Sequence, residues 1–229
     1  MKKHRFFITG ISSFVGVSVA KYLLEKGHHV TGITRNKSSN SLKEISSHEN
    51  LVLIEADLLN DFEMEKGIDL VFHAAAQAPN RNADVKDYVH NHVIATKKIL
   101  DKSIEAKAKR FVFCSSILVF GKITDKLLTE DTSIVNPNLQ GTCKYQGELI
   151  LKEKSDEIPS LALRLPGIVG KGAHNIWLSK VLEKAQKNEN IEITNPDAPF
   201  NNAIWTEDLA RFLEHLAEKD WKGDRKSVV

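Results

Sequence analysis

The sequence predicts an α/β fold with one doubly wound parallel sheet, followed by a small C-terminal lobe. Three observations support this prediction: short apolar runs recur through the first 165 residues, segments with helical spacing separate them, and the runs are apolar on both faces. Strands of this kind, alternating with helices, are typical of a parallel sheet that helices cover on both sides. Right-handed crossovers then place ligands at the carboxyl ends of the strands.

Each predicted strand is a short apolar run that ends near a glycine or a polar residue. The predicted strands span residues 5–9, 29–34, 51–54, 69–72, 110–114 and 161–165. Apolar residues at helical spacing occupy the segments between several of these runs. The predicted helices of this part span residues 14–26, 85–106 and 139–154.

The composition is that of an ordinary globular protein, with 41% hydrophobic and 27% charged residues in a chain of 229. The formal net charge of +2 gives no general attraction to nucleic acid or anionic lipid. No apolar run reaches the ~18 residues that a membrane span needs. The two cysteines, Cys114 and Cys143, are too few for a disulfide framework or a zinc site. We therefore expect a cytoplasmic protein that binds no metal, nucleic acid or membrane.

The segment between the first strand and the first helix has the character of a phosphate-binding loop. Gly10 permits a sharp turn, and Gly16 permits close packing of helix and sheet. The N-terminus of the helix offers free N–H groups and a positive dipole end to a pyrophosphate. A plain tight turn is the alternative. The residues of this candidate loop are Gly10, Ser12, Ser13, Phe14, Val15 and Gly16.

The pattern weakens after Pro166. Residues 175–187 predict a helix and residues 191–193 a short strand, and Thr206 is predicted to cap the N-terminus of a last helix. Residues 227–229 resemble the start of a strand, so we expect a further piece of chain downstream. The expected division is a main domain of residues 1–165 and a partial lobe of residues 166–229.

Together with the phosphate loop, further motifs follow the later strands and helices. They are Asp57, the run His73-Ala74-Ala75-Ala76, Asn91, the run 115–121, Lys144 with Glu148, the run 164–167 and the run 207–209. With these motifs the sequence resembles the extended short-chain dehydrogenase/reductase family, in its NAD-dependent epimerase/dehydratase group, over nearly the whole chain. The resemblance implies a Rossmann-type dinucleotide-binding domain at 1–165 and a partial substrate-binding lobe at 166–229. Members typically bind NAD or NADP and act on nucleotide-activated sugars.

The resemblance also implies contacts to the cofactor. Asp57 matches the residue that meets the adenine amino group, with Leu58 beside the ring. Ala74 and Ala75 match residues that pass close to the cofactor, and Pro166 is expected beside it as well. A turn residue without a ligand is the alternative for Asp57.

The segment after the second strand bears on the choice of cofactor. Members that prefer NAD usually carry an acidic residue there, which binds the ribose 2′-hydroxyl. Residues 34–39 contain no acid, and Arg35 could pair with a 2′-phosphate, with Asn36 beside it. We therefore expect NADP in preference to NAD. The alternative is that Arg35 is simply exposed to solvent.

The predicted catalytic end departs from the family pattern at Gln140. Ser116 matches the residue that hydrogen-bonds the reacting oxygen, and Lys144 matches the lysine that binds the nicotinamide ribose. The family's tyrosine stands four residues before that lysine, on the same helix face, and here the position is Gln140. Glutamine has no titratable proton and cannot act as a general acid or base. Alternatives for the other two residues are a strand-end cap for Ser116 and a surface position for Lys144.

No other residue is an obvious substitute for the absent tyrosine. Tyr145 is expected to point elsewhere on its helix, Cys143 has a short side chain, and His73 and His174 lack support from their positions. Proton transfer is typically worth about 10²–10⁴-fold in rate, so oxidation–reduction is expected to be slow.

Two functions remain open from the sequence. The first is an NAD(P)-dependent epimerase, dehydratase or reductase that acts on a nucleotide sugar or a related carbonyl or alcohol, with impaired proton transfer. The second is a dinucleotide-binding sensor or partner-binding protein without turnover. Asn201 stands where many nucleotide-sugar members place an arginine, which weakens the case for a diphospho-sugar. Family members often dimerise through the helices that match residues 85–106 and 139–154, which leaves a homodimer open.

Overall fold

The structure, a computed structural model of the chain, describes residues 2–77, 83–125, 127–173, 177–192, 203–221 and 224–228. Within these ranges the main sheet has seven strands in the order β3-β2-β1-β4-β5-β6-β9, and all neighbouring strands are parallel. This strand order confirms the predicted doubly wound fold. The direction of the chain connections reverses between β1 and β4, which is where such folds bind ligands. The strands are β1 Arg5–Thr9, β2 His29–Thr34, β3 Leu51–Glu55, β4 Leu70–His73, β5 Phe111–Ser116, β6 Ser160–Leu165 and β9 Asp224–Val228.

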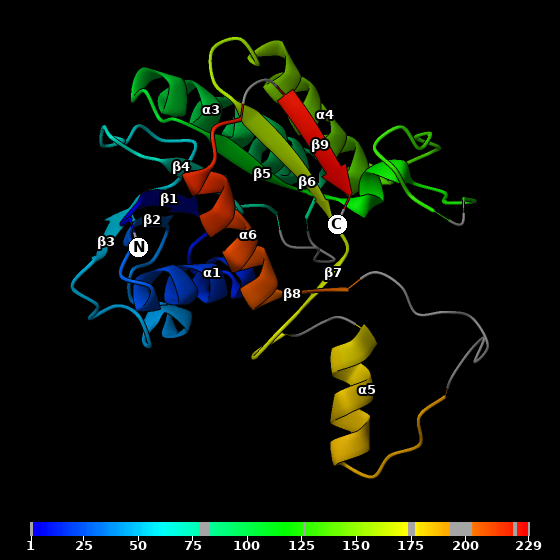
Figure 1. The fold of residues 1–229 in the computed structure, drawn as a ribbon. Helices are drawn as coiled ribbons and strands as arrows, with labels where there is room; N and C mark the ends of the chain where they lie inside the picture. Colours follow the sequence, from blue (N-terminus) through cyan, green and yellow to red (C-terminus); the bar gives the residue numbers. More distant parts are fainter. Residues whose placement is uncertain are drawn as a thin grey trace.

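Helices cover both faces of the sheet (Figure 1). On one face, Leu23 of α1 and Leu213 of α6 are buried with Phe6 of β1. On the other face, Ile99 of α3 belongs to a second buried cluster that includes Phe7 of β1. Alternate residues of β1 therefore point into two separate cores. The α-helices are α1 Phe14–Glu25, α2 Val85–Tyr88, α3 Ala95–Glu105, α4 Leu139–Glu153, α5 Trp177–Gln186 and α6 Thr206–Glu218.

The long helix predicted over residues 85–106 is interrupted. A π-helical turn, η2 (Val89–Ile94), separates α2 from α3. The side chain of Asn91 in this turn donates to the backbone carbonyl of Asp87 in α2 at 2.9 Å. A π-turn inserts one residue into a helix, and such insertions often occur at functional sites. Within the described residues, a 3₁₀ turn follows β2, η1 (Asn40–Leu42), and another follows β5, η3 (Ile117–Phe120).

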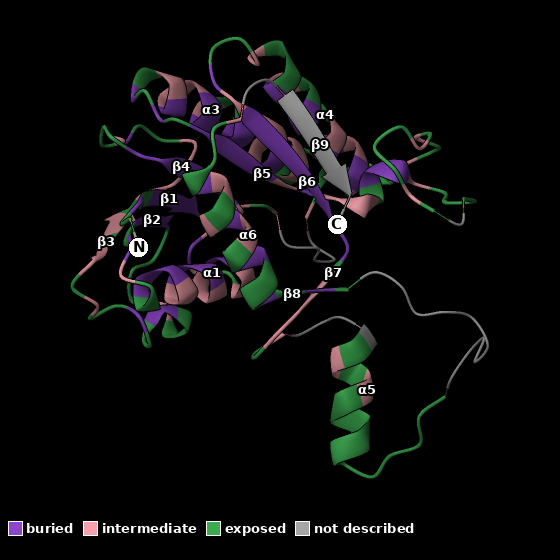
Figure 2. Ribbon diagram, in the orientation of Figure 1, coloured by how far each residue is buried: buried purple, intermediate pink, exposed green. Residues whose placement is uncertain are grey.

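The C-terminal part contributes to more than one layer. β7 (Gly167–Val169) pairs with β8 (Ala203–Trp205) in a separate two-stranded sheet. α5 stands apart from the main sheet (Figure 1), and most of its described surface is exposed (Figure 2). In contrast, α6 packs against α1, and β9 lies beside β6 in the main sheet. The division into two domains at residue 165 stays a prediction. Of the elements that follow this residue, β9 belongs to the main sheet and α6 to the helices that cover it.

Two local predictions about this part were wrong. The last helix begins at Thr206 itself, and Trp205 precedes it without a side-chain capping bond, so Thr206 is not the N-cap. Residues 191 and 192 are not in a strand, and residue 193 lies outside the described residues. Among the described residues, no helix combines the length and apolar composition that crossing a membrane requires.

A buried ion pair holds α4 against the sheet. The Glu148 carboxylate accepts hydrogen bonds from Arg164 of β6, with Nε at 3.0 Å and a terminal nitrogen at 2.8 Å. It also accepts one from Ser115 of β5 at 2.6 Å. Both charged side chains are almost completely buried, at 1% exposure each. Glu148 therefore links α4 to both β5 and β6.

Two glycines allow α4 to lie unusually close to its neighbours. A Cβ on Gly141 would stand 2.1 Å from the carbonyl oxygen of Leu118 in η3. A Cβ on Gly147 would stand 2.8 Å from the ring of Phe113 in β5. Both positions therefore require glycine, and α4 is fixed along its length by close packing as well as by charge.

We predict that Glu148→Gln lowers the free energy of unfolding by about 3–5 kcal/mol, because it leaves the Arg164 guanidinium buried without its counter-charge. Urea denaturation at neutral pH measures this. Glu153→Gln, on the exposed side of the same helix, is the matched control and should change stability by less than about 0.5 kcal/mol. Equal stability of the two variants would show that the ion pair does not hold α4.

Candidate functional site

A cavity of about 580 Å³ lies at the carboxyl ends of the central strands. Residues that follow β1 to β4 form its walls, and Gln140 reaches it from the first turn of α4. The residues predicted from sequence that line it are Gly10, Ser12, Ser13, Phe14, Val15, Arg35, Asp57, Leu58, Ala74, Ala75 and Gln140. The predicted residues that do not line it are Gly16, Asn36, Ser116, Lys144 and Pro166.

The end of the cavity at α1 is shaped by close backbone packing. Gly10 has a φ of +67°, and a Cβ there would stand 2.8 Å from the backbone of Ala75. Gly16 lies against the backbone of Gly10, where a Cβ would approach the carbonyl oxygen to 2.2 Å. Ser13 caps the helix, because its hydroxyl accepts from the Gly16 N–H at 3.1 Å. The loop is thus held tightly and presents the positive end of α1 to the cavity.

The residues after β2 and β3 carry the charges of the cavity wall. Arg35 is exposed and lines the cavity, and no ion pair involves it within the described residues. Asp57 lines it as well, while its carboxylate accepts from the Leu59 N–H at 2.8 Å. Asn36 instead supports the loop, because its side-chain oxygen accepts from the Ser38 N–H at 2.8 Å.

The opposite end of the cavity is uncharged. The lining residues there are Gln140 of α4, Cys114 of β5 and Asn91 of η2. Gln140 is half-buried, and its amide has no hydrogen bond within the described part of the chain. The lining residues that sequence reasoning did not assign to the site are Ile33, Thr34, Ala56, Ala76, Gln77, Asn91, Ala95 and Cys114. Cys114 and Ala76 could have been found from their positions at the ends of predicted strands, whereas Ala95 gave no such signal.

Lys144 lies next to this end but does not reach the cavity wall. It is 4% exposed, its Nζ donates to the Cys114 carbonyl at 2.6 Å, and it stands 4.7 Å from the centre of the Phe113 ring. Burial lowers the pKa of Lys144 below its ordinary value. The surface position that the sequence left open is therefore wrong, since the ammonium is buried beside the candidate catalytic end.

Ser116 occupies the end of β5. Its hydroxyl accepts from the Leu118 N–H at 3.2 Å, which makes it the N-cap of η3. The strand-end cap that the sequence left open is thus present. Because the hydroxyl accepts in this bond, its own proton stays available for a further acceptor. A role toward a reacting oxygen stays a prediction.

The pKa values of the buried titratable side chains bear on whether one of them can replace the absent tyrosine as an acid. Burial, and next the charge of Lys144, lower the pKa of His73 to about 3, so this histidine is neutral near pH 7. Burial raises the pKa of the thiols of Cys114 and Cys143. Neither thiol is therefore poised to ionise near neutral pH. His174 and Asn201 lie outside the described residues.

Comparisons with known proteins give one consistent family. A sequence model described as the NAD dependent epimerase/dehydratase family matches residues 6–229. Protein CapI of Staphylococcus aureus is 24% identical over an alignment of 242 positions, which covers 96% of this chain and 72% of that protein.

Two solved structures share the fold. One is UDP-N-acetylglucosamine 4-epimerase from Methanobrevibacter ruminantium M1, with a TM-score of 0.85 and 24% identity over 100% of this chain and 77% of that chain. The other is UDP-glucuronic acid 4-epimerase from Bacillus cereus in complex with NAD, with a TM-score of 0.82 and 19% identity over 98% of this chain and 78% of that chain.

We predict that acid destabilises the fold through its buried histidines. Burial, and next the charge of Lys144, lower the pKa of His92 to about 4, against an unfolded value near 6.5. The unfolded chain therefore binds more protons in this window. The free energy of unfolding should fall by about 1.4 kcal/mol per pH unit for this histidine as the pH drops from 6.5 toward 4.

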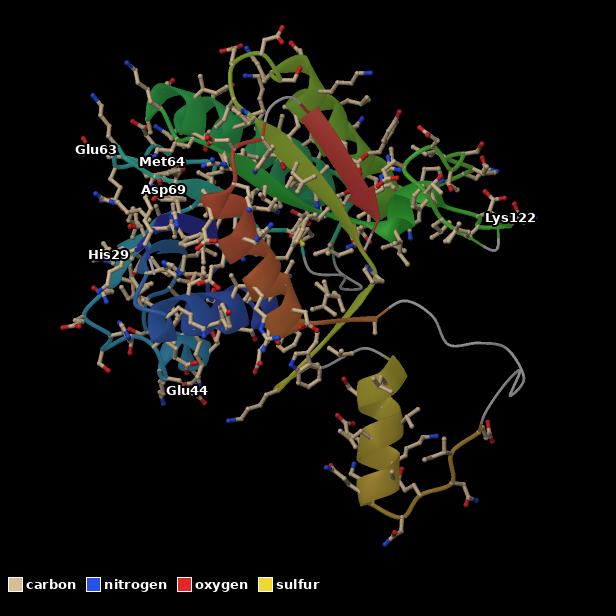
Figure 3. The ribbon with its side chains drawn as sticks, viewed as in Figure 1. His29, Glu44, Glu63, Met64, Asp69 and Lys122 are labelled. Carbon is tan, nitrogen blue, oxygen red and sulfur yellow. The ribbon has the colours of Figure 1, made fainter. Side chains whose placement is uncertain are left out.

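Urea denaturation at several pH values measures this slope in His92→Phe, which keeps an aromatic ring against Tyr88. The variant should show a shallower dependence than the unaltered protein. His29, exposed at the start of β2 (Figure 3), supplies the control His29→Gln, which should leave the slope unchanged. Identical slopes in all three proteins would contradict a depressed pKa at His92.

Proposed function

The chain belongs to the NAD dependent epimerase/dehydratase family, and we propose that it binds NAD or NADP in the described cavity. We further propose that it acts on a nucleotide sugar or a related carbonyl or alcohol, as an epimerase, dehydratase or reductase. The observation that carries the proposal is the continuous cavity from the N-terminus of α1 to Gln140 of α4. One end suits a pyrophosphate and the other suits a reacting ring.

The fit to a dinucleotide rests on the α1 end. The φ of +67° at Gly10 and its close contact with the backbone of Ala75 hold the turn that leads into α1. Helix N-termini stabilise anions through their free N–H groups and the helix dipole. Gly10, Ser12 and Ser13 would hold the diphosphate, and Asp57 with Leu58 would contact the adenine.

The choice between the two cofactors depends on the wall after β2. Arg35 lines the cavity without an ion-pair partner within the described residues, and residues 34–39 contain no acid. This favours a 2′-phosphate, hence NADP. The Bacillus cereus relative, by contrast, was solved with NAD.

The reaction would take place at the Gln140 end. The nicotinamide ring supplies or accepts a hydride when the cofactor is bound. Lys144 would contact the ribose by leaving the Cys114 carbonyl, and Ser116 would use its free hydroxyl proton to orient the reacting oxygen. Gln140 can donate or accept a hydrogen bond there, but it cannot transfer a proton. The proton must come from the substrate, water or another group.

A second candidate function follows from Gln140. A dinucleotide-binding protein without turnover, such as a sensor or a partner-binding relative, needs no proton donor, so an amide at this position does not impair it. The raised pKa values of Cys114 and Cys143 and the neutral His73 favour this candidate, because none of these three groups is poised to replace a phenol.

We predict that NADPH binds more tightly than NADH in fluorescence titrations of the purified protein. Arg35→Ala should weaken NADPH binding about tenfold, the loss of one charged hydrogen bond, and change NADH binding by less than about twofold. Lys37→Ala is the matched control, since Lys37 is exposed on the same loop and does not line the cavity. Tighter binding of NADH, unaffected by Arg35→Ala, would reverse the cofactor assignment.

We predict that Gln140→Tyr raises turnover by about 10²–10⁴-fold, because it restores a general acid beside Lys144. The assay follows interconversion of UDP-glucuronic acid and of UDP-N-acetylglucosamine with bound cofactor. Gln140→Phe, with a ring but no hydroxyl, is the control and should stay at the level of the unaltered protein. If the cofactor binds and neither Gln140→Tyr nor the unaltered protein turns over these sugars, the non-catalytic function stands instead.

A further inference from the structure

Three buried polar side chains form a hydrogen-bonded chain beside the cavity. Thr9 at the end of β1 and His73 at the end of β4 are direct partners across the parallel strands. Thr9 Oγ1 lies 2.6 Å from His73 Nδ1, and His73 Nε2 lies 2.9 Å from Thr96 Oγ1. The Ala75 N–H donates to Thr9 Oγ1 at 3.1 Å, and Thr96 Oγ1 donates to the His92 carbonyl. All three side chains are at 0% exposure.

The direction of every bond in this chain follows from counting hydrogens. A carbonyl can only accept, so the hydroxyl proton of Thr96 goes to His92. Thr96 must then accept from His73, which places a proton on Nε2. Burial lowers the pKa of His73 to about 3, so Nδ1 carries no proton and accepts from the hydroxyl of Thr9. One tautomer of His73 satisfies the whole chain.

The ends of the chain exclude a role in proton transfer. It begins at the backbone N–H of Ala75 and ends at a backbone carbonyl, and neither group delivers protons to a substrate. The hydrogen-bonded chain instead joins three segments of the cavity wall. Thr9 precedes Gly10, His73 precedes Ala74 and Ala75, and Thr96 follows Ala95.

We propose that His73 is a positioning residue, which as its neutral Nε2–H tautomer sets the spacing between the phosphate loop, the loop after β4 and the π-turn η2. The inference rests on the proposed dinucleotide site, because that spacing shapes the cavity. The ring also lies parallel to Phe113 of β5, at 5.6 Å between ring centres and 21° between planes. His73 is thus held from the strand on its other side as well.

The first test is nitrogen-15 NMR of the imidazole groups in the purified protein without cofactor. His73 should show a protonated Nε2 and an unprotonated Nδ1, with no titration between pH 8 and about 5. A protonated Nδ1, rapid averaging of the two tautomers, or titration near the ordinary histidine value would overturn the proposal. This result does not depend on whether the protein binds a dinucleotide.

The second test separates the hydroxyl of Thr9 from its packing. Thr9→Val removes the hydroxyl at constant shape, and it should weaken binding of NADH and NADPH about tenfold. Thr9→Ser keeps the hydroxyl and should bind within about twofold of the unaltered protein. Thr31→Val is the matched control, because Thr31 is a buried threonine of β2 that does not line the cavity.

The outcomes distinguish this inference from the proposed function. If the unaltered protein binds and Thr9→Val binds equally well, the positioning role is overturned while the dinucleotide site stands. If the unaltered protein binds neither dinucleotide, the proposed function falls and the positioning role falls with it. Should Thr9→Val fail to fold, Thr96→Val and Thr96→Ser provide the same comparison from the other end of the chain.

Discussion

Burying a carboxylate costs several kcal/mol unless donors compensate it, and Glu148 meets this condition only while α4 lies against β5 and β6. The position of the helix follows from that bond set. Gln140 then reaches the cavity, and Lys144 reaches the carbonyl of Cys114. Because Arg164 occupies the carboxylate of Glu148, no carboxylate pairs with Lys144 in the described part of the chain. The charge of Lys144 helps to keep His73 and His92 neutral.

The two ends of the cavity differ in what they require from the chain. At the α1 end, binding depends on backbone geometry, which glycines and the strand–turn–helix topology provide. Of the described lining residues, the charged ones are Arg35 and Asp57, and both come from this side. At the α4 end, the proposed chemistry would depend on individual side chains, and Gln140, which lines the cavity there, has no titratable proton.

Much of the fold could be predicted because strands buried on both faces are mostly apolar, and the tight turn before α1 because its glycines follow a strand. The π-turn η2 could not, because an inserted residue has no residue-type signal of its own. The pairing of β9 with β6 also could not, because nothing local in residues 224–228 specifies a partner. The helix that carries Lys144 could be predicted, whereas the hydrogen-bond partners of Ser116 and Lys144 could not, because they depend on how α4 and η3 pack.

The most direct test of the central claim is a crystal structure of the protein with its tighter-binding dinucleotide, NADH or NADPH. We expect the diphosphate at the N-terminus of α1, within hydrogen-bond distance of the backbone amides of residues 12–14. We also expect the nicotinamide ring at the Gln140 end, with Lys144 turned from the Cys114 carbonyl to the ribose. A dinucleotide bound in the reverse direction, or at another surface of the molecule, would contradict the account.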